Sequence, residues 1–396
     1  MKKLKGFLTT LLILFFSFLT RAQEKKEILP ASWRMENYIS RLQEKKVALL
    51  INQTSIVGSK NLLDTLLKRG VSVVKVFVPE HGFRGSADAG AHVNNEIDSA
   101  TNVPIISLYG NNKKPSKEQL ADIDVMIYDL QDVGTRFFTY ISSLEYLMQA
   151  CSENNKELIV LDRPNPNGFY VDGPLLQPKY KSFIGMQPIP VIYGMTVGEY
   201  ANMLKGEKWI SGLQTLKLTV IRCMNYDHTK TYSLPVPPSP NLKNMTAVYL
   251  YPSLCFFEGT VVSIGRGTDK PFQQFGHPKF KNEASYFFTP FSKIGASKPL
   301  LEGQNCFGTL IAETPEDALK LINRKLQLNW LIKAYTLYPD NKEFFNPFFE
   351  KLAGNNLLKQ QIISGMSEEK IRNSWQKDLK TFKKIRKKYL LYKDFE

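Results

Sequence analysis

The sequence predicts an α/β protein with a parallel sheet in its N-terminal part and a smaller α+β domain at its C-terminus. Apolar runs of strand length alternate with segments of helical periodicity as far as residue 221. Strands that alternate with helices form parallel sheets with right-handed crossovers. A segment with four prolines, residues 234–240, then ends this pattern. Short aromatic strands and long basic helices follow it, which indicates a second domain of different architecture.

Local patterns place the individual elements. Strands are expected at residues 47–51, 71–78, 103–109, 125–130, 158–161 and 216–221, where apolar and β-branched residues run together. Helices are expected at residues 61–68, 137–151 and 197–204, where apolar residues recur at helical spacing. Thr196 and Glu199 form a capping box that opens the last of these helices. In the second domain, Thr314 as N-cap and Pro315 after it predict another helix start.

The chain is expected to have a signal peptide at residues 1–22, a first domain at residues 23–240 and a second domain at residues 241–396. Three lysines near the N-terminus precede a short apolar run, and small residues precede a cleavage position after Ala22. The run is too short for a comfortable membrane span, so no stable membrane insertion is expected. The mature protein is expected to be exported, and to be periplasmic or secreted.

The composition favours an acidic partner. The chain has 396 residues and a formal net charge of +15, and the predicted signal peptide carries four basic residues and no acid. A basic surface suits nucleic acid, anionic lipid or a polymer that bears carboxylates. Export argues against nucleic acid and favours cell-wall material, whose muramic acid and stem peptides carry carboxylates.

Several other chemistries lack support. The four cysteines are far apart and most lie in apolar surroundings, so buried free thiols are expected, with one disulfide as the alternative. The four histidines form no His-Glu-x-x-His motif, and no metal site is expected. Neither a Walker loop nor a dinucleotide-binding glycine fingerprint occurs, so no cofactor is expected. A Gly-x-Ser-x-Gly nucleophile elbow is also absent from the sequence.

Polar residues follow three of the predicted strands. Ligands of open α/β sheets bind beyond the carboxyl ends of the strands, and in a parallel sheet these ends meet at one edge. The candidate substrate-binding and catalytic residues there are Glu80, His81, Arg84, Asp129, Asp132, Arg136, Asp162, Arg163 and Asn165. Acids, amides and arginines together suit a ligand rich in hydroxyl groups. Each cluster taken alone also fits a polar turn or a helix cap.

A second polar cluster lies beyond the proline-rich segment. It contains Glu258 and then the loop Gly265-Arg-Gly-Thr268. Glycines on both sides of Arg266 allow the backbone to approach a ligand closely. The loop can therefore offer N–H groups and a guanidinium to an anion, and Arg266 and Thr268 are predicted to bind substrate.

Several sequence blocks resemble the exo-β-N-acetylmuramidase family, formerly catalogued as a domain of unknown function. The blocks occur in order along nearly all of the expected mature chain. They are Pro79-Glu-His-Gly-Phe-Arg-Gly85, Asp129-Leu-Gln-Asp-Val-Gly-Thr-Arg136 continuing into Phe137-Phe-Thr-Tyr140, Asp162-Arg-Pro-Asn-Pro-Asn-Gly168, Asp172-Gly-Pro174, Gly194-Met-Thr196 with Gly198-Glu199, Pro237-Pro-Ser-Pro-Asn241, Phe257-Glu-Gly-Thr260, Gly265-Arg-Gly-Thr268, Trp375 and Tyr389-Leu-Leu-Tyr392.

This resemblance implies a Rossmann-like N-terminal domain, a smaller C-terminal domain and an active cleft between them. It also implies an exo-acting glycoside hydrolase that releases terminal N-acetylmuramic acid from the non-reducing end of peptidoglycan fragments. Such fragments would be the partner of the protein, while its oligomeric state stays open. The alternative is a non-catalytic protein that binds the same fragments, because recognition also needs arginines and amides.

By the same analogy, Glu80 is the leading catalytic carboxylate. Glycosidases usually need two carboxyl groups, and the second is expected among Asp129, Asp132, Asp162 and Glu258. Glu258 is favoured because a cleft between domains draws on both walls. His81 is expected to orient Glu80, and Arg266 or Arg163 to pair with the lactyl carboxylate that distinguishes muramic acid from N-acetylglucosamine.

Overall fold

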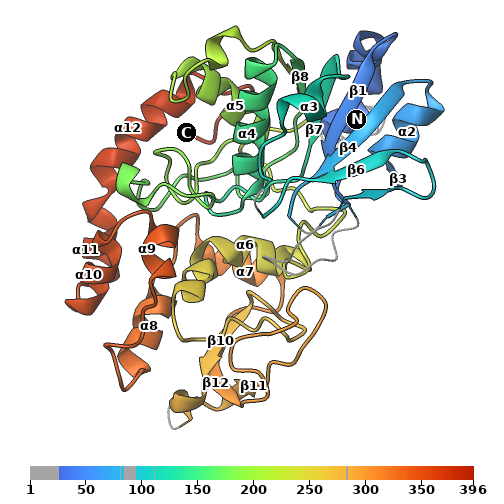
Figure 1. Cartoon of the computed structure of the whole chain (residues 1–396). Helices are drawn as coiled ribbons and strands as arrows, with labels where there is room; N and C mark the ends of the chain where they lie inside the picture. The colour runs from blue at the N-terminus through green and yellow to red at the C-terminus, as the bar shows by residue number, and fades with distance from the viewer. Residues whose placement is uncertain (1–25, 81, 84–94, 111, 282–283) are drawn as a thin grey trace, which may run out of the picture.

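The computed structural model describes residues 26–80, 82–83, 95–110, 112–281 and 284–396 (Figure 1). The predicted signal peptide, His81 and Arg84 lie outside the described residues.

The first domain is built on a seven-stranded sheet with the order β5-β6-β4-β1-β7-β8-β9. Its strands are β1 (Lys46–Ile51), β4 (Ser72–Val78), β5 (Glu96–Ile97), β6 (Pro104–Ser107), β7 (Val125–Asp129), β8 (Glu157–Leu161) and β9 (Leu218–Ile221). All neighbouring pairs are parallel except β5 with β6, which is antiparallel. Without β5 this is the strand order of a Rossmann fold. All six predicted strands are therefore confirmed. In the described part of the chain, the edge strand β5 and the short hairpin of β2 (Ile56–Val57) and β3 (Lys60–Asn61) were not predicted.

Both faces of the sheet are covered, as its near-continuous apolar strands require. Successive residues of β1 alternate between two cores: Leu49 packs in the cluster that contains α2 (Leu62–Lys68), and Leu50 packs in the cluster that contains α4 (Tyr140–Glu153) and α5 (Val197–Gly206). Figure 1 shows α4 and α5 on one side of the strands. The capping box of Thr196 and Glu199 at the start of α5 is confirmed.

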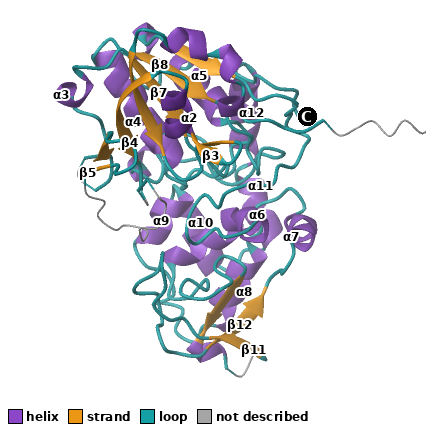
Figure 2. Ribbon diagram, turned by 90° about the vertical axis from the view of Figure 1, so that its right-hand side faces the viewer, coloured by secondary structure: helices purple, strands orange, loops and turns teal. Residues whose placement is uncertain are grey.

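The second part of the chain combines a small antiparallel sheet with helices (Figure 2). The three-stranded sheet has the order β10-β12-β11, with β10 (Gln274–His277), β11 (Tyr286–Phe288) and β12 (Cys306–Leu310). The helices are α6 (Met245–Leu254), α7 (Pro315–Ile322), α8 (Asn329–Leu337), α9 (Phe348–Ala353), α10 (Leu357–Ile363), α11 (Glu368–Ser374) and α12 (Gln376–Lys387). Thr314 caps α7 as predicted, by accepting the N–H of Asp317.

The C-terminal end of the chain returns to the first domain, as the position of α12 beside α5 in Figure 1 shows. Arg386 donates from Nε to the carbonyl of Gly194 at 2.9 Å, and the hydroxyl of Tyr392 donates to Asp162 at 2.6 Å. Residues 386–392 thus lie against the strand-end loops of the first domain, although they are distant from it in sequence.

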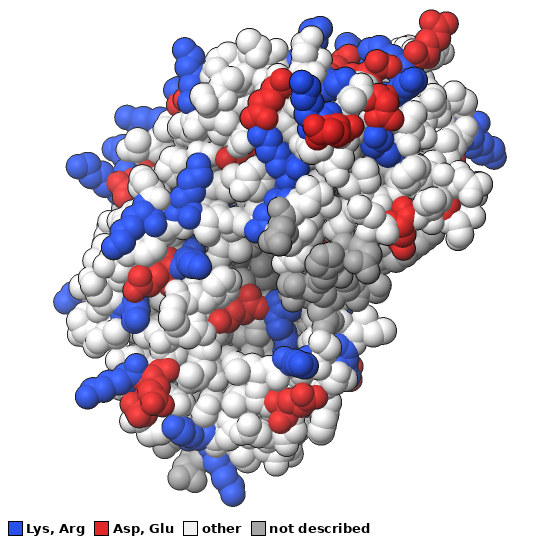
Figure 3. Space-filling view, in the orientation of Figure 1, with Lys and Arg blue, Asp and Glu red and all other residues white. Residues whose placement is uncertain are grey.

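The state of the cysteines and the distribution of surface charge can be compared with the expectations from the sequence. All four cysteines are buried free thiols, as preferred from the sequence. Lys and Arg side chains are spread among acids over the face in Figure 3, and a hollow opens near the middle of this face. Within the described ranges, no helix is long and apolar enough to cross a membrane.

Candidate active site

A cavity of about 390 Å³ lies at the carboxyl edge of the sheet and is lined by residues from both parts of the chain. Glu80 and Tyr109 reach it from just beyond the ends of β4 and β6, and Glu258 and Arg266 reach it from the second part. Its volume is within the range of small-molecule sites. Among the predicted site residues, the structure brings Glu80, Glu258 and Arg266 together here.

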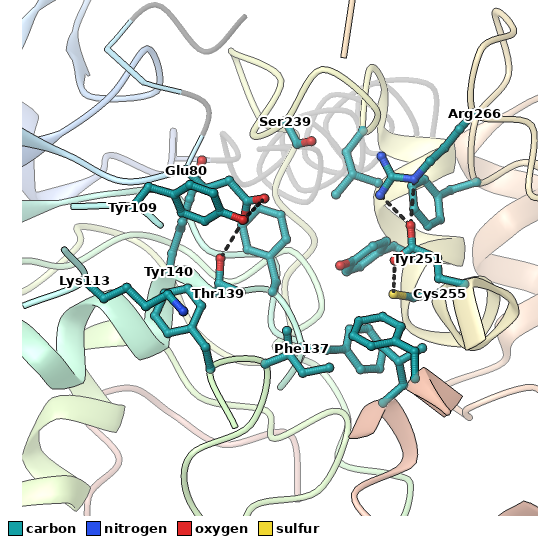
Figure 4. A pocket seen from close by; sticks show the side chains of 18 residues that line it. Glu80, Tyr109, Lys113, Phe137, Thr139, Tyr140, Ser239, Tyr251, Cys255 and Arg266 are labelled. Atoms are coloured by element: carbon teal, nitrogen blue, oxygen red, sulfur yellow. Dashed lines mark hydrogen bonds and ion pairs between the residues drawn. The ribbon is translucent and has the colours of Figure 1, made fainter. Parts of the chain in front are cut away.

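The carboxylate of Glu80 is held by hydroxyl groups. Tyr109 Oη donates to Oε1 at 3.1 Å, and Thr139 Oγ1 donates to Oε2 at 3.2 Å (Figure 4). Thr139 stands at the N-cap position of α4, so the end of β6 and the start of a helix together orient one acid. Both oxygens of Glu80 therefore have a defined direction in the cavity wall.

Glu258 is paired with Arg266 on the opposite wall. It lies in the 3-10 helix Cys255–Gly259, and its Oε1 accepts the N–H of Arg266 Nε at 2.7 Å. The same oxygen forms an ion pair with Arg266 Nη2 at 2.5 Å. The guanidinium also lies 5.0 Å from the ring of Phe272. Burial acts to lower the pKa of Arg266, but the nearby Glu258 outweighs it and raises this pKa. Arg266 therefore stays charged and fixes Glu258.

The glycines on both sides of Arg266 allow a tight backbone turn against neighbouring residues. Gly265 and Gly267 have φ of 77° and 80°, a region that favours glycine. A Cβ on Gly267 would lie 2.5 Å from the carbonyl oxygen of Phe291. The tight turn that aims Arg266 at Glu258 thus requires glycine. Thr268, predicted to bind substrate, donates to the carbonyl of Gly265 within this turn at 2.6 Å and is not among the cavity-lining residues.

Lys113 and a set of aromatic side chains also line the cavity, and sequence reasoning missed them. Lys113 follows β6 in a loop, with its Nζ 4.6 Å from the ring centre of Phe183. Other aromatic lining residues are Phe137, Phe138, Tyr140, Tyr251 and Phe272. The one available signal for Lys113 was its place shortly after a predicted strand end.

Asp129 and Arg163 form a buried ion pair away from the cavity. Nε of Arg163 donates to Oδ1 at 2.5 Å and Nη2 donates to Oδ2 at 2.8 Å. The two side chains are at most 1% exposed. Their donors and acceptors are used inside the protein, so the expectation that they contact a ligand is replaced by a structural role. In particular, Arg163 cannot pair with a substrate carboxylate without losing Asp129.

Asp132, Asp162 and Asn165 are likewise interior. Asp132 accepts the N–H of Gly134 and the hydroxyl of Tyr193. Asp162 accepts two backbone N–H groups and the hydroxyls of Thr196 and Tyr392. Asn165 donates to the carbonyl of Met195 at 2.8 Å. None of these three side chains lines the cavity, because the strand-end loops fold over them.

Arg136 connects the two parts of the chain. Its Nη1 donates to the carbonyls of Pro174 and Ile189, both at 2.8 Å. Its Nη2 donates to the carbonyls of Leu352 and Ala353, at 2.9 and 2.8 Å. The side chain is fully buried, so its guanidinium satisfies four backbone carbonyl groups. The expectation that it binds a ligand is therefore replaced by this structural role.

Asp132→Asn is expected to flatten the pH dependence of stability. Burial raises the pKa of Asp132 from 3.8 to about 7. Between these two values the folded state binds more protons than the unfolded state, so its stability falls as the pH rises through this window. Asparagine does not titrate. The variant should therefore lack the fall in the free energy of unfolding, on the order of a few kcal/mol, that ionisation of Asp132 causes in the wild type as the pH rises.

Urea unfolding at pH 5 and pH 8 measures this effect. Asp64→Asn, at an exposed position, serves as the control. Its free energy of unfolding should change between the two pH values as much as that of the wild type. If the free energy of unfolding changed equally with pH in Asp132→Asn and in the wild type, Asp132 would not hold its proton in the folded state.

No group of three or more His, Cys, Asp or Glu side chains in the described ranges is arranged to hold a metal ion. A Rossmann-like domain, a smaller α+β part and two carboxylates in a shared cavity define a protein with the groups that glycoside hydrolysis requires.

The chain belongs to the exo-beta-N-acetylmuramidase NamZ family. The family's N-terminal model matches residues 47–246, and its C-terminal model matches residues 249–392. The peptidoglycan beta-N-acetylmuramidase NamZ of Bacillus subtilis (strain 168) is 38% identical over 386 residues, which covers 90% of this chain and 89% of that protein. The resemblance found in the sequence blocks is thereby confirmed.

Two solved structures of DUF1343 family proteins from Bacteroides fragilis NCTC 9343 are also similar. The first has a TM-score of 0.86 and 45% identity, and the match covers 93% of this chain and all of that one. The second has a TM-score of 0.74 and 29% identity, over 92% of this chain and 99% of that one. The predicted α/β fold class is confirmed by this similarity.

Proposed function

We propose that this chain is an exo-acting glycoside hydrolase that releases terminal N-acetylmuramic acid from the non-reducing end of peptidoglycan fragments. Family membership over most of the chain supports the activity. The observation that carries the assignment to this cavity is that Glu80 and Glu258 line it from the two parts of the chain. Glycoside hydrolysis uses one carboxyl as acid and a second as base or nucleophile.

Glu80 is the proposed general acid. Its carboxylate accepts hydrogen bonds from the neutral hydroxyl groups of Tyr109 and Thr139, which orient it in the cavity wall. The protonated carboxyl donates its proton to the glycosidic oxygen as the bond to the anomeric carbon breaks. The departing sugar then leaves with a neutral hydroxyl group.

Glu258 is the proposed second carboxylate. The guanidinium of Arg266 favours the ionised form and holds it in one orientation. An ionised carboxylate next to the anomeric carbon stabilises the positive charge that develops there, and acts on water or on the sugar itself. The aromatic walls around the two acids match the apolar faces of a pyranose ring and exclude water.

The direct test is incubation of the purified protein with a disaccharide that ends in N-acetylmuramic acid and with a β-N-acetylglucosaminide. Mass spectrometry of the released sugars gives the result. Release of N-acetylmuramic acid alone is expected. Release of N-acetylglucosamine alone, or of neither sugar, would rule out the proposed activity.

We also propose that the protein acts outside the cytoplasm, in the periplasm or the medium. The lysines, apolar run and small residues at the N-terminus support export, and peptidoglycan lies on that side of the membrane. Expressed at full length in its host, the protein should be processed to begin at Gln23. Intact-mass measurement of the purified protein checks this, and an unprocessed chain in the cytoplasmic fraction would contradict it.

A further inference from the structure

Four charged side chains of the described residues line the cavity, and their partners differ. Glu258 and Arg266 neutralise each other, since two nitrogens of the guanidinium bind one carboxylate oxygen. Glu80 accepts hydroxyl groups on both of its oxygens. Lys113 makes no ion pair with any residue in the described part of the chain. The cavity therefore offers one ammonium group whose charge is not matched by a carboxylate.

The position of Lys113 is defined by aromatic packing. Its Nζ stands 4.6 Å from the ring centre of Phe183, and Phe183 stacks on Tyr146 with an interplanar angle of 12°. A ring face attracts an ammonium group without neutralising it and without using up its N–H donors. Figure 4 shows Lys113 on the wall of Glu80 and Tyr109, with its nitrogen directed toward the open part of the cavity.

Arg266 is less suited to bind a carboxylate from a ligand. Its Nε and Nη2 already bind Glu258, and a second carboxylate at the same guanidinium would lie close to the first. Like charges at short distance repel each other. Arg163, the other cation predicted for this role, is buried against Asp129. Among the cations that the structure describes in the cavity wall, Lys113 is thus the one that an incoming anion meets without displacing a carboxylate.

We propose that Lys113 binds the carboxylate of an acidic sugar in this cavity and so selects the lactyl ether of N-acetylmuramic acid over N-acetylglucosamine. The inference rests on the proposed function and names the residue that sets its substrate class. The ammonium group donates charge-assisted hydrogen bonds to the carboxylate at partial burial. A neutral sugar leaves this ammonium group without an anion and gains nothing from it.

The test compares three nitrophenyl β-glycosides: N-acetylmuramic acid, its lactyl methyl ester and N-acetylglucosamine. Lys113→Met keeps the length and apolar stem of the side chain and removes the charge. We expect it to lower kcat/KM for the acid by roughly 10- to 100-fold, as for loss of a charged hydrogen bond. The preference of the enzyme for the acid over its methyl ester should fall toward one.

Two further variants make the test specific. Lys114→Met is the matched control, because Lys114 pairs with Glu153 at 2.6 Å and does not line the cavity. It should keep the wild-type preference for the acid. Lys113→Arg retains the charge and should keep most of that preference, which a merely structural lysine would not require.

The outcomes separate this inference from the activity itself. If the wild type cleaves the acid and Lys113→Met keeps its acid-over-ester ratio, the role of Lys113 is refuted while the proposed function stands. If the wild type cleaves none of the glycosides, the proposed function fails, and calorimetric binding of N-acetylmuramic acid decides about Lys113. Equal affinity of wild type and Lys113→Met for that sugar would then refute the inference.

Discussion

Glu80→Gln is expected to lower kcat roughly 10²- to 10⁴-fold, the contribution of a general acid in a glycosidase. The amide still offers one oxygen to Tyr109 or Thr139, so the cavity wall keeps its shape, but it cannot give up a proton in this reaction. KM should change little, because the loss falls on the transition state. Steady-state hydrolysis of a disaccharide ending in N-acetylmuramic acid measures the effect.

The leaving group distinguishes an acid from a merely structural carboxylate. The leaving group of a dinitrophenyl glycoside, dinitrophenolate, departs as a stable anion and needs no proton. Glu80→Gln should therefore lose much less activity on this substrate than on the disaccharide. Glu96→Gln, an exposed position on β5, is the control and should behave as the wild type on both substrates. An equal loss on both substrates would refute the acid role of Glu80.

Arg136→Met is expected to destabilise the protein by at least ~3 kcal/mol, because a buried donor set is removed and its acceptors are left without partners. Two of the four carbonyls that Arg136 binds, at residues 174 and 189, belong to the first part of the chain. The other two, at residues 352 and 353, belong to the second part. Methionine fills the volume of the stem and satisfies none of them. Urea unfolding monitored by far-UV circular dichroism measures the loss.

The comparison with a surface arginine makes this result specific. Arg41→Met, at an exposed position, should leave the unfolding midpoint nearly unchanged. Arg136→Lys keeps the charge but offers fewer directed donors, so an intermediate loss is expected. A variant with wild-type stability and a raised KM would instead support the substrate-binding role that the sequence suggested for Arg136.

The strands and Glu80 were predictable because their signals are local. The apolar run of β4 ends at Pro79, and an acid directly after a parallel strand lies at the edge where ligands bind. The capping box of Thr196 and Glu199 is equally local, since its hydrogen bonds span three residues. Such features depend on neighbouring residues and were recovered with small errors at the ends of elements.

The same strand-end signal was ambiguous for the other acids. Asp129 ends β7 and Asp162 directly follows β8, so both lie at strand ends as Glu80 does, yet both are buried. Arg163 neutralises Asp129, and the hydroxyl of Tyr392 reaches Asp162 from the far end of the chain. No local pattern distinguishes an acid that will be covered by a distant segment from one that will face a cavity.

Lys113 is the opposite case, a residue that lines the cavity but was not predicted to do so. Nothing in its neighbourhood separates it from Lys114, yet Lys114 pairs with Glu153 while Lys113 enters the cavity over Phe183. Their difference arises from where the loop after β6 lies relative to residues far along the chain.

The amino-acid sequence alone therefore specified the α/β architecture, the six parallel strands of the main sheet, the family and a candidate for the catalytic acid, because hydrophobic periodicity, caps and motif blocks act over short distances. Only the tertiary structure decided which polar side chains form the site and which ones hold the fold together. The physical reason is that burial and pairing of a charge depend on partners hundreds of residues away, as the contacts of Arg136 with Leu352 and of Asp162 with Tyr392 demonstrate.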